Sequence, residues 1–321
     1  MTVHRRVDDF VTTTGEPEAT LPTRERPSTR RGFVRPLERR DLEPIADIFL
    51  RVFRGIDRPA LRHAAIPAVA AHLEELYLDC PWYDADRGSL VHVDADGTLD
   101  GFLGSIQLPM TIDGTALTAS AMGTFMVAEP MRGSGAAVDL LRSHVANGLD
   151  IHFTDTANRI SLGFRRGMKF ELLPMHSLEW VIALRPARLA AQRAARRWRL
   201  LPARVLDRMA RPLDAPLRRM IGGERHVDER ATVREVTSAE FVAWATARVG
   251  ERRLRPDWTP ERLEWLVDRA SRRTGNGPLR ARAAVNAEGH VIGQWLVYAE
   301  SGTVASVLQV FAGPDRERSV L

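Results

Sequence analysis

Hydrophobic residues form their sharpest pattern in the middle of the chain. Residues 121–127 are an apolar run that predicts a strand buried on both faces. Residues 130–135 contain a proline and two glycines, which predict the end of this strand and a turn. A helix is expected from about Ser134, and its apolar positions recur at helical spacing at Val138, Leu141 and Val145. The predicted order is a buried strand, a glycine turn and a helix N-terminus.

The chain before this turn predicts two helices and three short strands. The first helix is expected to begin after Asp41, which would cap it, and the second covers residues 59–78. Strands are expected at residues 33–37, 89–93 and 101–110, with turns at 94–97 and 112–115. After the glycine turn and its helix, further strands are expected at residues 151–154 and 178–182.

From Ala231 onward the same order of elements repeats. Ser238 is expected to cap a helix, and residues 254–260 form an aromatic loop. The predicted strands are 232–236, 281–285, 291–298 and 305–311, and the predicted helices are 241–249 and 263–270. Residues 312–318, where a glycine turn would follow, hold one glycine and acidic side chains, so no cofactor is expected there. The chain stops at Leu321 as the matching helix would begin, so this half is expected to be incomplete.

These patterns predict an α/β fold in which a mixed, mostly antiparallel central sheet is flanked by helices, with two such halves in tandem. Residues 1–32 have few apolar side chains and are expected to be a flexible tail, because they cannot bury enough surface to become ordered. The expected division is this tail, a first domain at 33–184, an Arg-rich helical linker at 185–230 and a degenerate second half at 231–321.

Positive charge is concentrated in the linker. The chain has 46 Lys and Arg against 41 Asp and Glu, a net charge of +5. Residues 185–225 hold twelve Arg against three acidic residues, a local net charge of +9, so the rest of the chain carries −4. Basic helices can bind nucleic acid, acidic partners or membrane surfaces. A solvated linker packed by Trp198, Leu200 and Leu201 is the favoured interpretation, because Arg side chains snorkel and prolines divide the segment; nucleic acid is not an expected partner.

The composition, 44% hydrophobic and 27% charged residues, is that of a soluble globular protein. No apolar run approaches the roughly 18 to 20 residues that span a bilayer, so no transmembrane segment is expected. The N-terminus lacks a secretory pattern, and the single Cys80 excludes an intramolecular disulfide, so a cytoplasmic location is expected. No metal ligands are singled out, and a homo-oligomer is left open.

The glycine turn suits a phosphate, because a helix N-terminus presents N–H groups and the positive end of the helix dipole. A nucleotide P-loop needs a lysine that is absent here, and a dinucleotide fold needs a third glycine after the first strand. The motif Arg132-x-x-Gly135-x-Ala137 instead resembles the Gln/Arg-x-x-Gly-x-Gly/Ala signature of the GCN5-related N-acetyltransferases. The preceding order of helices and strands is similar to that family as well.

The resemblance implies that acetyl-CoA binds as co-substrate. Its pyrophosphate would lie on the loop formed by Arg132, Gly133, Ser134, Gly135, Ala136 and Ala137. The preceding strand would bind the pantetheine arm and splay open to offer N–H groups to the thioester oxygen at Phe125, Met126 and Val127. The asparagine at the start of the next helix, which contacts the cofactor arm in the family, matches Asn158.

The chain departs from the family where the general acid is expected. A tyrosine usually follows the asparagine, and Phe164 and Arg165 occupy its place here. Arg165 or Arg166 could instead stabilise the thiolate electrostatically. The nearest candidate bases in the sequence are His152, Asp155 and Glu129, but no catalytic residue is assigned. Trp82 and Tyr83 follow the helix pair that shapes the acceptor site in the family; packing under a loop is favoured over stacking on a substrate.

The main functional prediction is an acyltransferase that moves an acetyl group from acetyl-CoA to an amine by direct transfer in a ternary complex. The alternative is an acyl-CoA-binding regulator or scaffold that uses the arginine segment. An aminoacyl transferase acting on cell-wall precursors ranks third, because such enzymes pair two halves of this fold but lack an intact CoA loop. The acceptor stays open among small amines, sugar amines and protein lysines.

Overall fold

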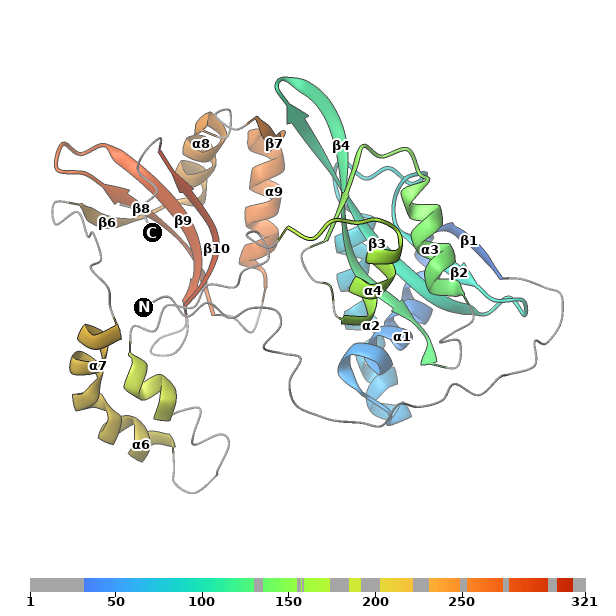
Figure 1. The fold of residues 1–321 in the computed structure, drawn as a ribbon, viewed down its shortest axis with the longest axis horizontal. Helices are drawn as coiled ribbons and strands as arrows, with labels where there is room; N and C mark the ends of the chain where they lie inside the picture. The colour runs from blue at the N-terminus through green and yellow to red at the C-terminus, as the bar shows by residue number, and fades with distance from the viewer. Residues whose placement is uncertain are drawn as a thin grey trace. The chain divides into compact units, whose positions relative to one another are not determined.

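The computed structural model describes residues 32–129, 135–154, 157, 159–173, 185–191, 203–221, 231–248, 253–273, 277–299 and 305–313 (Figure 1). These residues form two compact units. One contains the described residues up to Phe170 together with those from Thr232 onward, and the other contains those between Glu171 and Ala231. The predicted tail up to residue 31, the strand at 178–182 and the basic stretch at 193–199 lie outside the described residues. The predicted domain boundaries stay a prediction.

The first sheet is mixed and mostly antiparallel. Its strands in spatial order are β1 (Phe33–Pro36), β2 (Leu90–Val93), β3 (Leu99–Ile112), β4 (Thr115–Val127) and β5 (Ile151–Phe153). Only β4 and β5 pair in parallel. The two-residue turn between β3 and β4 has positive φ at Asp113 and Gly114, as a tight hairpin turn requires.

Helices cover both faces of this sheet. A 3-10 turn, η2 (Arg39–Asp41), leads into α1 (Leu42–Arg54), and α2 (Pro59–Tyr77) follows. These helices pack on the face that carries Val91 and Phe102, whereas α3 (Ala136–Val145) packs on the face that carries Leu90 and Leu103. Adjacent strand residues point to opposite faces, so one sheet supports two cores. The last helix of this half is α4 (Arg159–Gly167).

The second half repeats the first. Its sheet has the order β10 (Ala305–Ala312), β9 (Val291–Ala299), β8 (Leu279–Val285) and β6 (Thr232–Val236), and all pairs are antiparallel. Between β6 and β8 lie α8 (Ser238–Arg248), β7 (Leu254–Pro256) and α9 (Pro260–Ser271). Apart from β7, the sequence of elements is again a strand, two helices and three strands. The predicted α/β class and its tandem arrangement are therefore confirmed.

Four local predictions are wrong, and three of them concern residues 121–127, residues 254–256 and the start of α8. Residues 121–127 are not buried on both faces, because only Met122 and Met126 are fully buried and the others are half-buried. Residues 254–256 were expected in a loop but form β7, because β3 extends beyond β2 and leaves an edge with which they pair. The cap of α8 is Thr237 rather than Ser238, since the Thr237 hydroxyl accepts from the Glu240 N–H and the Glu240 carboxylate accepts from the Thr237 N–H.

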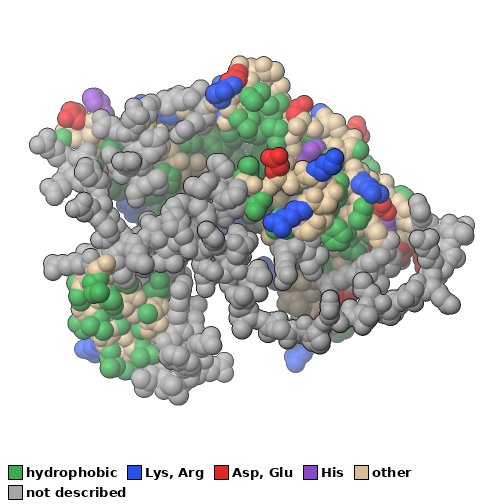
Figure 2. All heavy atoms as spheres, in the orientation of Figure 1, with side chains coloured by type: hydrophobic (Ala, Val, Ile, Leu, Met, Phe, Trp, Pro, Cys, Tyr) green, Lys and Arg blue, Asp and Glu red, His purple; other side chains and the backbone are tan. Residues whose placement is uncertain are grey.

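The other unit contains α6 (Ala203–Ala210), a 3-10 turn η5 (Arg211–Leu213) and α7 (Asp214–Ile221). Asp214 accepts hydrogen bonds from the N–H groups of Ala187 and Arg188, which lie at the start of a short helix at 186–191. Figure 2 shows hydrophobic side chains on the surface of this unit, and its exposed large ones among the described residues are Leu172, Leu173, Val205, Met209, Leu213 and Met220. None of the described helices in the chain has the length and apolar character of a membrane span.

The turn before α1 is fixed by Asp41. Its buried carboxylate accepts two hydrogen bonds from Arg35, at 2.6 and 2.7 Å, and one from the Glu38 N–H at 2.9 Å. The hydrogen bond and the charge of this carboxylate raise the pKa of Arg35 against the opposing effect of burial. Asp41 is the N-cap residue of α1, as predicted, but its side chain makes no hydrogen bond to the start of this helix, so the predicted side-chain cap is wrong. The bidentate ion pair with Arg35 binds the Asp41 carboxylate oxygens more strongly than the N–H groups at the start of α1 would.

We expect Asp41→Asn to lower the free energy of unfolding by about 2 kcal/mol, because it leaves the half-buried Arg35 without its counter-charge. Urea denaturation measures this change. Asp96→Asn, in the exposed turn after β2, is the control and should shift stability by less than about 0.5 kcal/mol. Equal stability of the Asp41 variant and the wild type would contradict the role of the pair.

Candidate functional site

A β-bulge interrupts β4 near its end. Gly123 pairs with Gly104 and Met126 pairs with Phe102, so two residues of β4, Thr124 and Phe125, lie opposite one residue of β3. The extra residue reverses the faces of the strand. Met122 packs in the α3 core, while Met126 packs in the core under α1 and α2, although residues four apart in a regular strand share a face.

Among the described residues, the opposite edge of β4 is paired only in its middle. β5 pairs with β4 only at Ala119–Ala121, and the Thr154 hydroxyl then donates to the Met122 carbonyl at 2.9 Å. Ala128 N–H donates to the Asp100 carbonyl on β3. Because N–H directions alternate along a ladder, the Val127 N–H points away from β3, toward the open edge. Among the described residues, β5 and Thr154 thus cover β4 only as far as Met122, and the splay expected at Phe125, Met126 and Val127 stays a prediction.

The helix that follows β4 begins with a glycine in a left-handed conformation. Gly135 has φ 98° and precedes the first residue of α3, Ala136. A Cβ added at Gly135 would meet no atom of the described residues within 4 Å, so a side chain at this position would have room. Val138 and Asp139 both donate their N–H groups to the Gly135 carbonyl. This geometry suits an anion at the helix start.

The predicted cofactor residues divide into two sets. Phe125 lies in the bulge and Met126 and Val127 follow it, whereas Gly135, Ala136 and Ala137 form the helix start. Four others lie outside the described residues, namely Arg132, Gly133, Ser134 and Asn158. The two described sets are the end of β4 and the beginning of α3, as the motif predicts. Their role in binding stays a prediction.

Tyr77, at the end of α2, contacts the bulge and was missed by the sequence analysis. Its hydroxyl lies 2.7 Å from the Thr124 Oγ1. Burial raises the pKa of Tyr77 to about 12, while the Thr124 hydrogen bond acts in the opposite direction. A Cβ at Gly104 would overlap the Tyr77 ring, and a Cβ at Gly123 would lie 3.3 Å from the Tyr77 hydroxyl. The two strand glycines were the available signal, since glycine inside a strand marks a close approach.

A buried polar chain crosses the face covered by α3. The Ser120 hydroxyl lies 2.8 Å from Ser105 Oγ and 2.8 Å from His144 Nε2, and the His144 ring packs edge-on against His152, with centroids 5.0 Å apart. Burial lowers the pKa of the half-buried His152, although a backbone hydrogen bond at Leu149 opposes the effect. His152 therefore lies on the face opposite Tyr77.

The remaining candidates for proton transfer do not converge on the bulge. Glu129 is exposed, and Asp155 lies outside the described residues. On α4, Phe164 and Arg166 are exposed, and the side chain of Arg165 is outside the description. The geometry therefore assigns no general base or acid.

Trp82 joins the two halves. Its Nε1 donates to the Gln107 carbonyl, and its ring meets Trp265 edge-on, with centroids 5.2 Å apart. Arg269 lies over Trp265, 5.3 Å from the ring centre, and donates to the Glu75 carbonyl at 2.8 Å. These contacts agree with the packing interpretation of Trp82 rather than with stacking on a substrate.

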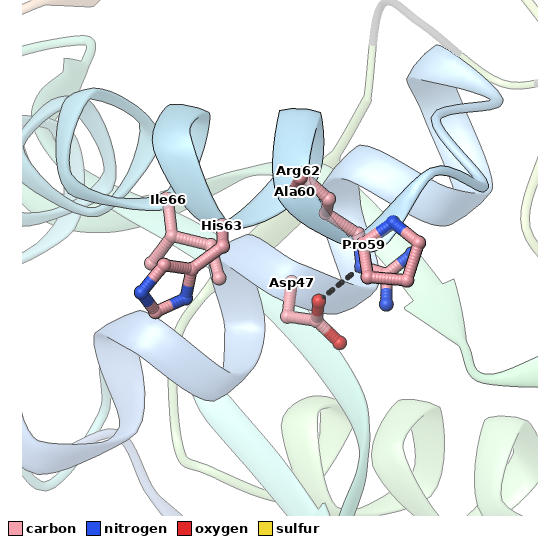
Figure 3. Close-up of a pocket in the computed structure, with 6 residues that line it drawn as sticks. All are labelled: Asp47, Pro59, Ala60, Arg62, His63 and Ile66. Atoms are coloured by element: carbon pink, nitrogen blue, oxygen red, sulfur yellow. Dashed lines mark hydrogen bonds and ion pairs between the residues drawn. The ribbon is translucent and has the colours of Figure 1, made fainter.

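A surface hollow lies between α1 and α2 (Figure 3). Its lining residues are Asp47, Pro59, Ala60, Arg62, His63 and Ile66. Arg62 donates to the Asp47 carboxylate at 2.5 Å and to the carbonyls of Ile56 and Asp57, so it fixes the loop between the helices. The hollow is not lined by residues of β4 or α3.

No protein-family model matches the sequence, and no curated protein matches it. Among solved structures, a conserved protein from Enterococcus faecalis V583, described as a probable N-acyltransferase, is 11% identical, with a TM-score of 0.50 over 88% of this chain and 58% of that chain. A GCN5-related N-acetyltransferase from Kribbella flavida is 14% identical, with a TM-score of 0.46 over 90% of this chain and 60% of that chain. The chain thus spans less than two thirds of the length of either structure.

The likeness to the Enterococcus structure, the strand order and the bulge agree on one architecture. The chain has the GCN5-related N-acetyltransferase fold, in two tandem halves. The resemblance stated from the glycine motif is confirmed at the level of the fold. The sequence identity is too low to carry an activity or a substrate across.

We expect stability to fall as pH is lowered from about 7.5 to 5.5, because the unfolded chain binds a proton on His152 near its ordinary pKa of about 6.5 while the folded chain resists it. His72 should also reduce stability as pH is lowered, because burial and, to a smaller extent, the charge of Arg269 lower its pKa. Urea denaturation at both pH values measures the effect. His152→Gln should make the dependence shallower, and His290→Gln, in an exposed turn, should leave it unchanged.

Proposed function

We propose that the first half binds acetyl-CoA and transfers its acetyl group to an amine. The observation that carries the proposal is the bulge in β4, which turns the Val127 N–H toward the open edge of the strand just before the glycine-led start of α3. An N–H donor at a strand edge, followed by a helix N-terminus, suits a ligand that has a carbonyl at one end and phosphates at the other. A thioester of CoA has both.

The residues fit this ligand in two places. Gly135 leaves open space before the helix, and the helix dipole favours the negative pyrophosphate there. In the proposed complex, the neighbouring Arg132 adds positive charge, and Asn158 contacts the pantetheine arm. At the other end, the Val127 N–H would donate to the thioester oxygen as that oxygen gains negative charge.

The proposed reaction is direct transfer. The amine nitrogen attacks the thioester carbon, a C–N bond forms and the C–S bond breaks. The proton lost by the amine is balanced by the proton that the CoA thiolate gains. Holding both reactants in one site supplies much of the acceleration without a covalent enzyme intermediate. We place this activity in the cytoplasm, as the single Cys80 suggests.

A second function, an acyl-CoA-binding regulator, is favoured by one observation. Helix α4 carries Phe164 and Arg165 where the family is expected to have its proton-donating tyrosine, and neither has a phenolic hydroxyl. The two functions differ in turnover. Release of free CoA thiol from acetyl-CoA, screened over small amines, sugar amines and lysine peptides, should rise above the rate without acceptor for at least one class. Saturable binding with no release for any class would support the regulator.

We expect Gly135→Glu to abolish acetyl-CoA binding in calorimetry, because it forces a side chain onto φ 98° and places a carboxylate against the pyrophosphate. Gly148→Glu is the matched control: Gly148 has φ 77° and equally open surroundings, but lies after α3. Both variants should lose similar stability, and only the first should lose affinity. Unchanged affinity in a folded Gly135 variant would remove this loop from the proposed site.

The second half should not bind the cofactor. The described residues after β10 end at Gly313, and the sequence then continues with Pro314 and alternating charges. We expect saturation binding of acetyl-CoA to give one site per chain in calorimetry. Two equivalent sites would show that the second half is not degenerate.

A further inference from the structure

Thr124 has an unusual backbone conformation for its residue type. Its φ is 45°, in the left-handed region that a β-branched residue strongly disfavours. Only two other non-glycine residues in the described part of the chain have positive φ. Asp113 lies in the hairpin turn and Lys169 follows α4, so Thr124 is the one inside a strand. Such strain persists only where the surroundings hold it, and it is concentrated at functional sites.

A bulge does not by itself require this strain. β10 holds the corresponding position in the second half, and its pairing with β9 also shifts register, between Val307 and Gln309. No residue of β10 has positive φ. The strain at Thr124 therefore belongs to the first half alone, which is the half with the glycine-led helix.

Tyr77 holds the strained residue. Its side chain is 2% exposed, its ring packs edge-on against Phe102 with centroids 5.5 Å apart, and its hydroxyl lies 2.7 Å from Thr124 Oγ1. Space for the tyrosine side chain comes from Gly104 and Gly123, which pair with each other directly before the bulge. Glycine weakens a strand interior, so the packing is obtained at a cost in strand stability. A phenylalanine would fill the same volume, so the hydroxyl is the feature that packing leaves unexplained.

We propose that Tyr77 is a positioning residue for the acyl group: by holding Thr124 it fixes the bulge and thereby aims the Val127 N–H at the thioester carbonyl. The inference rests on the proposed function and goes beyond it by assigning a residue from α2, on the face opposite α3. Tyr77 acts through Thr124 and touches no reacting atom. The backbone segment between Thr124 and Val127 is three peptide units long, so a change of φ at Thr124 redirects the N–H at its far end.

The test compares CoA with acetyl-CoA, because only the latter has the carbonyl. Both affinities are measured by calorimetry for the wild type and for Tyr77→Phe, Thr124→Val, Thr124→Ser and the Tyr77→Phe/Thr124→Val double variant. We expect the affinity for CoA to be kept and the preference for acetyl-CoA over CoA to fall about two- to tenfold in Tyr77→Phe and Thr124→Val, the range for one hydrogen bond. Thr124→Ser keeps a hydroxyl and should restore the preference. The double variant should be no worse than either single variant, because both remove the same interaction.

The infrared stretch of acetyl-CoA labelled with carbon-13 at the carbonyl gives a second readout. A hydrogen bond lowers this frequency, so the bound wild-type value should be lower than that in Tyr77→Phe and Thr124→Val. Tyr298→Phe is the matched control, since the buried Tyr298 hydroxyl donates to the Ala270 carbonyl at 2.8 Å in the second half. It should lose stability without changing the preference or the stretch. If Tyr77→Phe fails to fold, Thr124→Val and Thr124→Ser carry the test.

The outcomes separate this inference from the proposed function. Normal CoA binding with an unchanged preference and an unchanged stretch in folded variants would overturn the positioning role alone. A wild-type protein that binds neither CoA nor acetyl-CoA would overturn the proposed function and the positioning role with it. An equal loss of CoA and acetyl-CoA affinity in Tyr77→Phe would show a role in general site integrity and would also overturn the inference.

Discussion

The extra residue in β4 determines how the first half is built. A shift of one residue moves every following side chain of a strand to the other face. Because Thr124 adds that residue, Met122 belongs to the α3 core and Met126 to the core under α1 and α2. The same residue sets the direction of the last N–H groups of the strand. Core packing and the proposed acyl site therefore depend on one backbone irregularity, and neither can change without the other.

The repeat within the chain separates what the fold needs from what the site needs. Both halves have a strand, two helices and three antiparallel strands, and both bulge in the last strand of that series. Within the part of the chain that the structure describes, only the first half combines its bulge with a strained threonine, a tyrosine and a helix led by a left-handed glycine. The shared features are those of the architecture. The unshared ones are the features on which the proposed acyl site rests.

The sequence predicted the elements well where the pattern was local. Apolar periodicity located α1 and α9, and the Asp113-Gly114 turn followed from its two residues. The predictions failed where contacts between residues far apart in the chain determine the local structure. The hydrogen bond between Tyr77 and Thr124 joins residues 47 apart, and β7 forms only because β3 offers an unpaired edge. The Asp41 carboxylate likewise binds Arg35, from another element, instead of the helix N–H groups that the sequence predicted as its partners. Periodicity contains no information about such partners.

The pairing of β7 with β3 has a consequence for synthesis of the chain. Residues 110–112 of β3 pair with residues 254–256, and Arg253 adds a two-point ion pair to Asp113, which is 140 positions earlier. The far end of the β3–β4 hairpin therefore leaves the ribosome well before its partner strand. At about 5–20 residues per second, it waits on the order of ten seconds with an unpaired edge. An unpaired strand edge is a template for association with other chains. Nascent chains that stop short of residue 253 keep this edge open, so they are the species most in need of a chaperone.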